Sequence, residues 1–270
     1  TVLHAWKAGE QTVALRKQLE AMRDGGVFAI HVPKAPYRCP PGPYERACLV
    51  ANYFKKAKPK SKVLILDSNE DVVSKKPLFT KIWKELYPNM IEYRPNSELV
   101  DVDAASSTIK LTFDDVKADV LNVLPSMKAG KIAESAGLIT ANNRWCEVDF
   151  LTYESKAAKN VHVLGDAILA APAMPKSGHM DNGHGKNCAA AVIALIKNQP
   201  VNPTPMLTNT CYSFVTDKDV IHIASVHRYD DAKKTMVTVE GSGGLSAAAS
   251  EQEGQYALAW AKNIWADVLA

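Results

Sequence analysis

The stretch VFAIHVPKAPYRCPPGPYERACLVANYF, residues 27–54, together with VLILD at residues 63–67, decides the fold. Residues 27–32 form a short apolar run that predicts a buried strand. Pro43 then stands at the first position of a helix, where proline is tolerated. One face of that helix carries four recurring residues: Tyr44, Ala47, Ala51 and Phe54. The next apolar run ends in Asp67, and a strand, a helix and a strand ending in an acid indicate one half of a nucleotide-binding fold.

The turn between the first strand and this helix lacks the glycines of a dinucleotide site. Such a site has the pattern GxGxxG, because glycine lets the backbone approach a pyrophosphate at the helix N-terminus. Here residues 33–43 read PKAPYRCPPGP, which is rich in proline and poor in free amides. We therefore expect that this half does not bind NAD(P) and presents Cys39 at a helix N-terminus, where a thiolate is favoured. A structural turn with an inert cysteine is an equally good interpretation.

The segments around this unit extend the prediction. Residues 7–22 have the apolar spacing of a helix and are followed by two glycines. Residues 109–113 alternate and residues 118–124 are mostly apolar, so we expect both to be strands that complete the sheet. Residues 131–137 predict a short helix.

A second unit with chemical interest lies between residues 160 and 197. Residues 160–167 predict a strand that ends in Gly165 and Asp166, and residues 185–197 predict an alanine-rich helix that is apolar on nearly all sides and therefore buried. A carboxylate at such a strand end can accept hydrogen bonds from a ribityl chain, while the helix N-terminus favours the anionic end of a reduced flavin. The alternative is an Asp that closes a strand beside an ordinary capping loop.

The last part of the chain follows a linker containing Pro200, Pro203 and Pro205. Residues 210–214, 220–226 and 235–239 predict strands, and a helix closes the chain. The helix carries a ridge that we expect to be buried in the core: Tyr256, Trp260, Ile264 and Val268. This part is predicted to be a small α+β docking module.

The composition excludes several classes of protein. The net charge of +3 is too small for a protein whose affinity for nucleic acid comes from neutralising phosphates. No apolar run is long enough to span a membrane. The five cysteines are an odd number without a CxxC pair, and although His184 and Cys188 are four residues apart, we predict no metal site.

Four segments resemble the flavoprotein subunit of flavocytochrome c sulfide dehydrogenase. They are YRCPPGPYER at residues 37–46, VHVLGDA at 161–167, MPKSG at 174–178 and NTCYS at 209–213. The resemblance implies an α/β fold in three parts. Residues 1–125 would be a degenerate NAD-domain-like βαβ unit preceded by a helix, 126–200 the C-terminal part of an FAD-binding domain, and 201–270 the α+β cytochrome-docking domain.

The resemblance also implies a function and the residues that perform it. A periplasmic enzyme of this family oxidises sulfide to sulfur or polysulfide with FAD and passes electrons to a c-type cytochrome subunit that carries haem c. Cys39 and Cys211 match the redox-active disulfide beside the flavin. The residues that match the cofactor-binding segments are Gly165, Asp166, Ala167, Lys176, Ser177 and Gly178. Lys176 could stabilise negative charge near the flavin, although a solvated loop lysine is the more ordinary interpretation.

One feature of the family is absent from the sequence. The family has an ADP-binding GxGxxG unit and a cysteine that links covalently to the flavin, and this sequence contains neither. We therefore expect an N-terminal flavin-binding polypeptide to hold FAD jointly with this chain. The alternatives are a non-catalytic fragment or redox-partner docking module, and a quinone-reducing sulfide oxidase, which would need an apolar surface for membrane contact.

Overall fold

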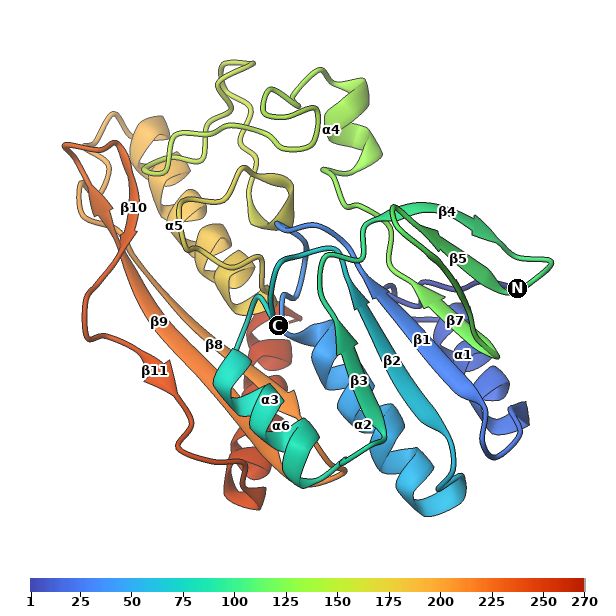
Figure 1. Ribbon diagram of the computed structural model, residues 1–270. Helices are drawn as coiled ribbons and strands as arrows, with labels where there is room; N and C mark the ends of the chain where they lie inside the picture. The colour runs from blue at the N-terminus through green and yellow to red at the C-terminus, as the bar shows by residue number, and fades with distance from the viewer. Residues whose placement is uncertain (270) are drawn as a thin grey trace.

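The computed structural model describes residues 1–269, and its centre is a parallel sheet. The strands β1 (Val27–Val32) and β2 (Lys62–Asp67) pair in parallel, as do β1 and β7 (Val120–Val123). β3 (Ile91–Arg94) extends the sheet beside β2, so the order is β3-β2-β1-β7 (Figure 1). The predicted α/β fold and the predicted strands at residues 27–32 and 63–67 are confirmed.

Three helices accompany this sheet. They are α1 (Glu10–Ala21), α2 (Gly42–Ala57) and α3 (Lys76–Glu85). The predicted face of α2 is confirmed, because its four residues are completely buried in the core: Tyr44, Ala47, Ala51 and Phe54. The sequence analysis did not predict α3 or β3.

A second, antiparallel sheet corrects one expectation. β4 (Leu99–Asp103), β5 (Thr108–Leu111) and β6 (Asp115–Lys117) pair only with one another in the described residues. We expected the alternating run at residues 109–113 to complete the parallel sheet, and this prediction is wrong, because the run belongs to the antiparallel sheet. Only the second predicted strand does so, as β7.

The middle of the chain departs most from prediction. The short helix is confirmed as α4 (Lys131–Ser135), but residues 160–167 form no strand. Within the described residues, this segment makes a single isolated bridge, between Glu154 and His162, and then turns into the 3-10 helix η1 (Gly165–Ala167). Gly165 has φ of 71°, a left-handed conformation that breaks the extended run and that glycine adopts without strain.

Helix α5 (Gly178–Ile196) is longer and less buried than expected. It begins seven residues earlier than predicted because Ser177 caps it: the Ser177 hydroxyl accepts a hydrogen bond from the Met180 N–H at 3.2 Å. Its C-terminal half exposes apolar residues instead of burying them: Ile193, Leu195 and Ile196. The expectation of a buried helix is therefore wrong for this half.

The last part of the chain is an antiparallel sheet with one helix. β9 (Val220–Asp230) pairs with β8 (Met206–Phe214), β10 (Thr235–Thr238) and β11 (Gly244–Leu245), and α6 (Glu251–Val268) closes the chain. Figure 1 shows the long β8 and β9 pair standing beside the parallel sheet. Val215 and Ile221 join the same apolar core as α2, so the two sheets pack together.

The predicted core ridge on α6 is wrong for two of its four residues. Tyr256 and Val268 are more than half exposed, while Gly254 and Ala257 are buried. A Cβ atom at Gly254 would lie 2.2 Å from the Lys218 carbonyl oxygen, so the helix packs through its small residues. Trp260 and Ile264 are half-buried, and the Trp260 ring packs 5.7 Å from the His179 ring, whereas Tyr256 and Trp265 face outward.

No helix in residues 1–269 is long and apolar enough to cross a membrane. The boundaries at residues 125 and 200 stay predictions.

Candidate active site

The carboxyl end of β1 leads into the loop that carries Cys39. Cys39 has φ of 58°, its N–H donates to the Lys176 carbonyl oxygen at 2.9 Å, and its own carbonyl accepts from the Gly42 N–H at 2.9 Å. Gly42 must be a glycine, because a Cβ atom there would lie 2.9 Å from the Cys39 sulfur and 2.6 Å from the Trp6 ring. Two backbone hydrogen bonds and the close packing of Gly42 therefore hold the Cys39 loop in one conformation.

The structure brings Cys211 to the same place. Cys211 lies in the middle of β8, and its sulfur is near enough to contribute to the pKa of Cys39. All five cysteines in residues 1–269 are free thiols in this structure, and only Cys39 and Cys211 are partly exposed. The predicted pair therefore shares one site as two thiols, and a disulfide between them stays a prediction.

The electrostatics of Cys39 correct one expectation. Burial, and then the nearby Glu45 and Cys211, raise the pKa of the Cys39 thiol to about 12. The Gly42 N–H at the start of α2 and the Lys75 cation lower it, but by less. The helix N-terminus therefore acts in the expected direction, yet desolvation outweighs it and the isolated thiol is not a ready thiolate.

Two charged residues that were not predicted from the sequence lie near the two cysteines. Glu45 on α2 accepts a hydrogen bond from the Phe214 N–H at 3.0 Å, and burial raises its pKa. Lys75 is only 3% exposed, and its Nζ donates to the Cys211 carbonyl oxygen at 2.8 Å and to the Ser213 hydroxyl at 2.7 Å. The two cysteines thus have a half-buried acid and a buried lysine as neighbours.

The predicted cofactor residues meet at the start of α5. Gly165, Asp166 and Ala167 form η1, while Lys176, Ser177 and Gly178 lead into the helix. Lys176 is 3% exposed, so the interpretation as a solvated loop lysine is wrong. Its Nζ donates to the carbonyl oxygens of Asp166 and Ile168 at 2.9 and 2.6 Å and lies 3.7 Å from the centre of the Trp145 ring.

Three of these six residues line a cavity of about 480 Å³. Asp166 and Ala167 line it together with Arg38, Trp145 and Lys176. The Asp166 Oδ1 atom is buried and has no hydrogen-bond partner in the described residues. A buried carboxylate oxygen without a partner is costly, and the hydroxyls of a bound molecule would satisfy it. The residues therefore fit the polyhydroxyl chain of a flavin.

A second cavity of about 460 Å³ lies on the other side of Lys176. It is lined by Tyr37, Lys176 and Cys211, with Asn209 and Ser225 from the antiparallel sheet. The Ser177 hydroxyl donates to the Asn209 Oδ1 atom at 2.6 Å, which ties the start of α5 to β8. Cys211 therefore opens to a space that is separate from the one at Asp166.

Asp67 is not free to bind a nucleotide ribose. Its Oδ2 atom accepts from the hydroxyls of Tyr44 at 2.6 Å and Tyr93 at 3.1 Å, and its Oδ1 atom accepts from the Asn69 side chain at 2.7 Å. The side chain is completely buried. The absence of NAD(P) binding stays a prediction, and these contacts give it a physical reason.

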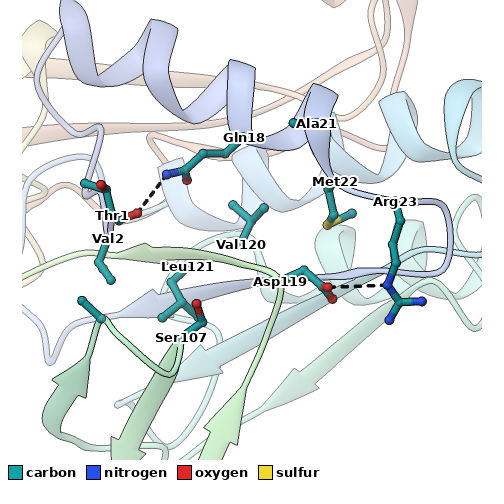
Figure 2. A pocket seen from close by; sticks show the side chains of 11 residues that line it. Thr1, Val2, Gln18, Ala21, Met22, Arg23, Ser107, Asp119, Val120 and Leu121 are labelled. Atoms are coloured by element: carbon teal, nitrogen blue, oxygen red, sulfur yellow. Dashed lines mark hydrogen bonds and ion pairs between the residues drawn. The ribbon is translucent and has the colours of Figure 1, made fainter.

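Another groove, of about 400 Å³, lies at the opposite end of the parallel sheet (Figure 2). Its polar contacts are a hydrogen bond from the Gln18 side chain to the Thr1 carbonyl at 2.8 Å and an ion pair between Arg23 and Asp119 at 3.7 Å. It contains none of the predicted site residues.

Asp181, on the first turn of α5, gives a testable pH dependence. Burial, and then the Asp166 carboxylate, raise the pKa of Asp181 to about 7, so folding favours its protonated form. That contribution to stability is complete below the unfolded pKa of about 4 and is lost as the pH rises through about 7. We expect Asp181→Asn to raise the free energy of unfolding by about 1–2 kcal/mol at pH 8, after allowance for its partial exposure.

Near pH 4 the variant and the wild type are expected to be equally stable in urea titrations. Asp267→Asn is the control, since Lys186 and Asn182 lower the pKa of that exposed carboxyl and its removal brings no gain. A loss of stability in Asp181→Asn at pH 8 would contradict this account of the site.

Two segments match family models. Residues 12–125 match "sulfide dehydrogenase [flavocytochrome c] flavoprotein chain, central", and residues 203–269 match "flavocytochrome c sulphide dehydrogenase, flavin-binding". The two segments together cover about two thirds of the chain. They contain Cys39 and Cys211, respectively.

Solved structures show the same fold at low identity. A chain of the Tetrahymena thermophila mitochondrial ATP synthase is 19% identical with a TM-score of 0.60, over 81% of this chain and 54% of that one. The Cu(II) complex of a cysteine-to-serine mutant of the HOCl-induced flavoprotein disulfide reductase RclA from Escherichia coli is 12% identical with a TM-score of 0.52, over 84% and 55%. An NAD-dependent persulfide reductase from A. fulgidus is 12% identical with a TM-score of 0.51, over 94% and 51%. This chain spans about half the length of each.

Proposed function

We propose that this chain, which belongs to the family of flavoprotein chains of flavocytochrome c sulfide dehydrogenase, carries the reactive cysteine pair of an FAD-dependent enzyme that oxidises sulfide. The observation that carries the proposal is the shared site of Cys39 and Cys211, which come from distant segments and meet beside two charged residues. In this proposal the pair reacts as a disulfide, and the two thiols described above are its reduced form.

The reaction begins with hydrosulfide, which attacks one sulfur of the disulfide between Cys39 and Cys211. A new S–S bond forms between hydrosulfide and that cysteine, the old S–S bond breaks, and the other cysteine leaves as a thiolate with the electron pair. The hydrosulfide proton stays on the terminal sulfur of the persulfide. Glu45 can take up that proton, because a half-buried carboxyl with a raised pKa exchanges its proton nearer neutral pH than an exposed one.

The residues that would hold FAD are Asp166 and Ala167 in η1 with Lys176, Ser177 and Gly178 at the start of α5. The unpartnered Asp166 Oδ1 atom supports this assignment. When bound, FAD supplies an acceptor for two electrons that can release them one at a time. The buried Lys176 places a positive charge at the cavity wall and orients the backbone there through its two carbonyl contacts.

The partner in this proposal is a c-type cytochrome subunit that carries haem c, and the complex acts in the periplasm. The family description supports the cytochrome, and the outward-facing aromatic residues of α6, Tyr256 and Trp265, offer a surface for a protein partner. A polypeptide segment with the ADP-binding pattern completes the FAD site, because this sequence has no GxGxxG.

The proposal is tested first on the cysteines themselves. After mild oxidation of the protein, peptide mass spectrometry is expected to find Cys39 linked to Cys211. After treatment with sodium sulfide and alkylation, one of the two is expected to carry an additional sulfur atom. Cys146 and Cys188 are buried and serve as internal controls that stay unmodified. The proposal fails if oxidation links neither cysteine to the other, or if the linked pair does not react with sulfide.

A further inference from the structure

Lys75 is a buried cation whose ammonium group is hydrogen-bonded only to neutral groups in the described residues. It is the residue before α3, where its backbone is left-handed with φ of 54°, and its side chain turns inward toward β8. Both hydrogen-bond acceptors of its Nζ are neutral, the Cys211 carbonyl oxygen at 2.8 Å and the Ser213 hydroxyl at 2.7 Å. In residues 1–269 no carboxylate lies within 4.0 Å of it.

A buried ammonium without a direct counterion is costly to the fold. The groups that face Lys75 come from four elements, and each favours its charged form: Cys211 on β8, Glu45 on α2, Cys39 before α2 and Glu253 on α6. Burial outweighs these groups and lowers the pKa of Lys75 to about 8. The charge therefore persists at neutral pH and faces both sulfurs.

We propose that Lys75 is the positioning residue of the cysteine pair, held by Ser213 and the Cys211 backbone so that its charge stabilises whichever of Cys39 and Cys211 is released as a thiolate. This inference rests on the proposed function, because that function opens a disulfide. When hydrosulfide opens it, the electron pair of the broken S–S bond stays on the leaving sulfur. Lys75 supplies the nearby positive charge that this sulfur otherwise lacks in a dry site.

The other buried lysine, Lys176, does not stabilise a thiolate at the cysteine pair. The Lys176 ammonium is bound to the carbonyls of Asp166 and Ile168 over the Trp145 ring, and the sulfur it faces is that of Cys146. Lys75 is among the main influences on the pKa of Cys39 and lowers it, and Lys176 is not among them. The two lysines therefore serve separate ends of the site, one at the cysteines and one at Asp166.

The test measures thiol reactivity in the reduced full chain, without sulfide or flavin. The rate of alkylation of Cys39 and Cys211 by iodoacetamide is followed by peptide mass spectrometry from about pH 6 to about pH 10. We expect Lys75→Met to react about tenfold more slowly at pH 8, with the pH profile displaced upward by about one unit. Lys75→Arg, which keeps its charge at every pH, is expected to retain the low-pH limb of the wild-type profile.

Lys76→Met is the matched control, since Lys76 is the next residue, is exposed and pairs only with Asp71. Its profile should equal that of the wild type. A folded Lys75→Met protein with the wild-type profile overturns the inference. If near-ultraviolet circular dichroism shows that Lys75→Met does not fold, the alkylation profile of Ser213→Ala tests the inference instead. It removes one anchor of Nζ and must shift the profile upward by a smaller amount, and an unshifted profile rejects the inference.

The two experiments distinguish failure of the role of Lys75 from failure of the proposed reaction with sulfide. A protein whose alkylation depends on Lys75 but whose disulfide does not react with sulfide keeps the role of Lys75 and rejects the reaction. A protein that forms the persulfide but shows no dependence on Lys75 keeps the reaction and rejects the inference.

Discussion

Replacing Cys39 by serine is expected to lower sulfide-dependent reduction of cytochrome c, by the flavin-loaded complex of this chain with the ADP-binding segment, roughly a thousandfold or more. Serine keeps the size of the side chain but cannot form the S–S bond that hydrosulfide opens. Cys211→Ser is expected to have the same effect. Because the two sulfurs act as one unit, the double variant should be no slower than either single variant. Stopped-flow absorbance of the cytochrome measures each rate.

Cys188→Ala is the control for this experiment. Cys188 is a buried thiol on α5 whose loss leaves both reactive sulfurs in place, so the variant should keep its turnover. Binding of FAD, followed by its visible absorbance, should be unchanged in all of these variants. A Cys39→Ser protein that binds FAD and keeps more than about a tenth of the wild-type rate contradicts the proposed reaction.

Removing the Tyr44 side chain is expected to be the most damaging single change to the fold. Tyr44 is completely buried against Phe79 and Trp83, with ring centres 5.6 and 6.2 Å away, and its hydroxyl donates to the buried Asp67. Tyr44→Ala leaves a cavity and takes one donor from a buried carboxylate. The free energy of unfolding should fall by about 4–5 kcal/mol in urea titrations.

Tyr44→Phe separates the two contributions, because it keeps the ring and removes only the hydroxyl. We expect it to cost about 2 kcal/mol, the range for a hydrogen bond to a charged group. Tyr53→Phe is the control on the same helix: its half-buried hydroxyl makes no hydrogen bond in residues 1–269, and its change should stay within about 0.5 kcal/mol. Equal losses in the two Phe variants would show that the contact with Asp67 contributes nothing.

Local sequence patterns correctly predicted the helices and strands whose apolar residues recur at regular spacing. The strands at β1 and β2 and the face of α2 have regular apolar spacing and were found correctly. Helix α3 has the same kind of signal, with Phe79, Ile82 and Trp83 on one side, and could have been found. The run at residues 160–167 also alternates, but no neighbouring strand pairs with it, so alternation alone was misleading there.

The charged residues of the site could not be found in this way. Lys75 meets the Cys211 carbonyl across 136 positions, and Glu45 meets the Phe214 N–H across 169. Nothing within a few residues of either one indicates that it is buried. The exposure of Lys176 and of the α6 ridge was predicted wrongly for the same reason. Lys176 was judged by its residue type and the ridge by its spacing, while distant neighbours decide how exposed each side chain is.

The distance in sequence between Cys39 and Cys211 has a consequence for the synthesis of the protein. A nascent polypeptide presents Cys39 long before the ribosome has made Cys211, so the first thiol must wait, unpaired, for its partner. Three other cysteines emerge in between, and each of them ends in the interior. Once tertiary structure has formed, those three are withdrawn from exchange and the correct linkage is the one still accessible. Under the proposed function, oxidation after folding would therefore link Cys39 to Cys211 and leave the three interior cysteines unlinked.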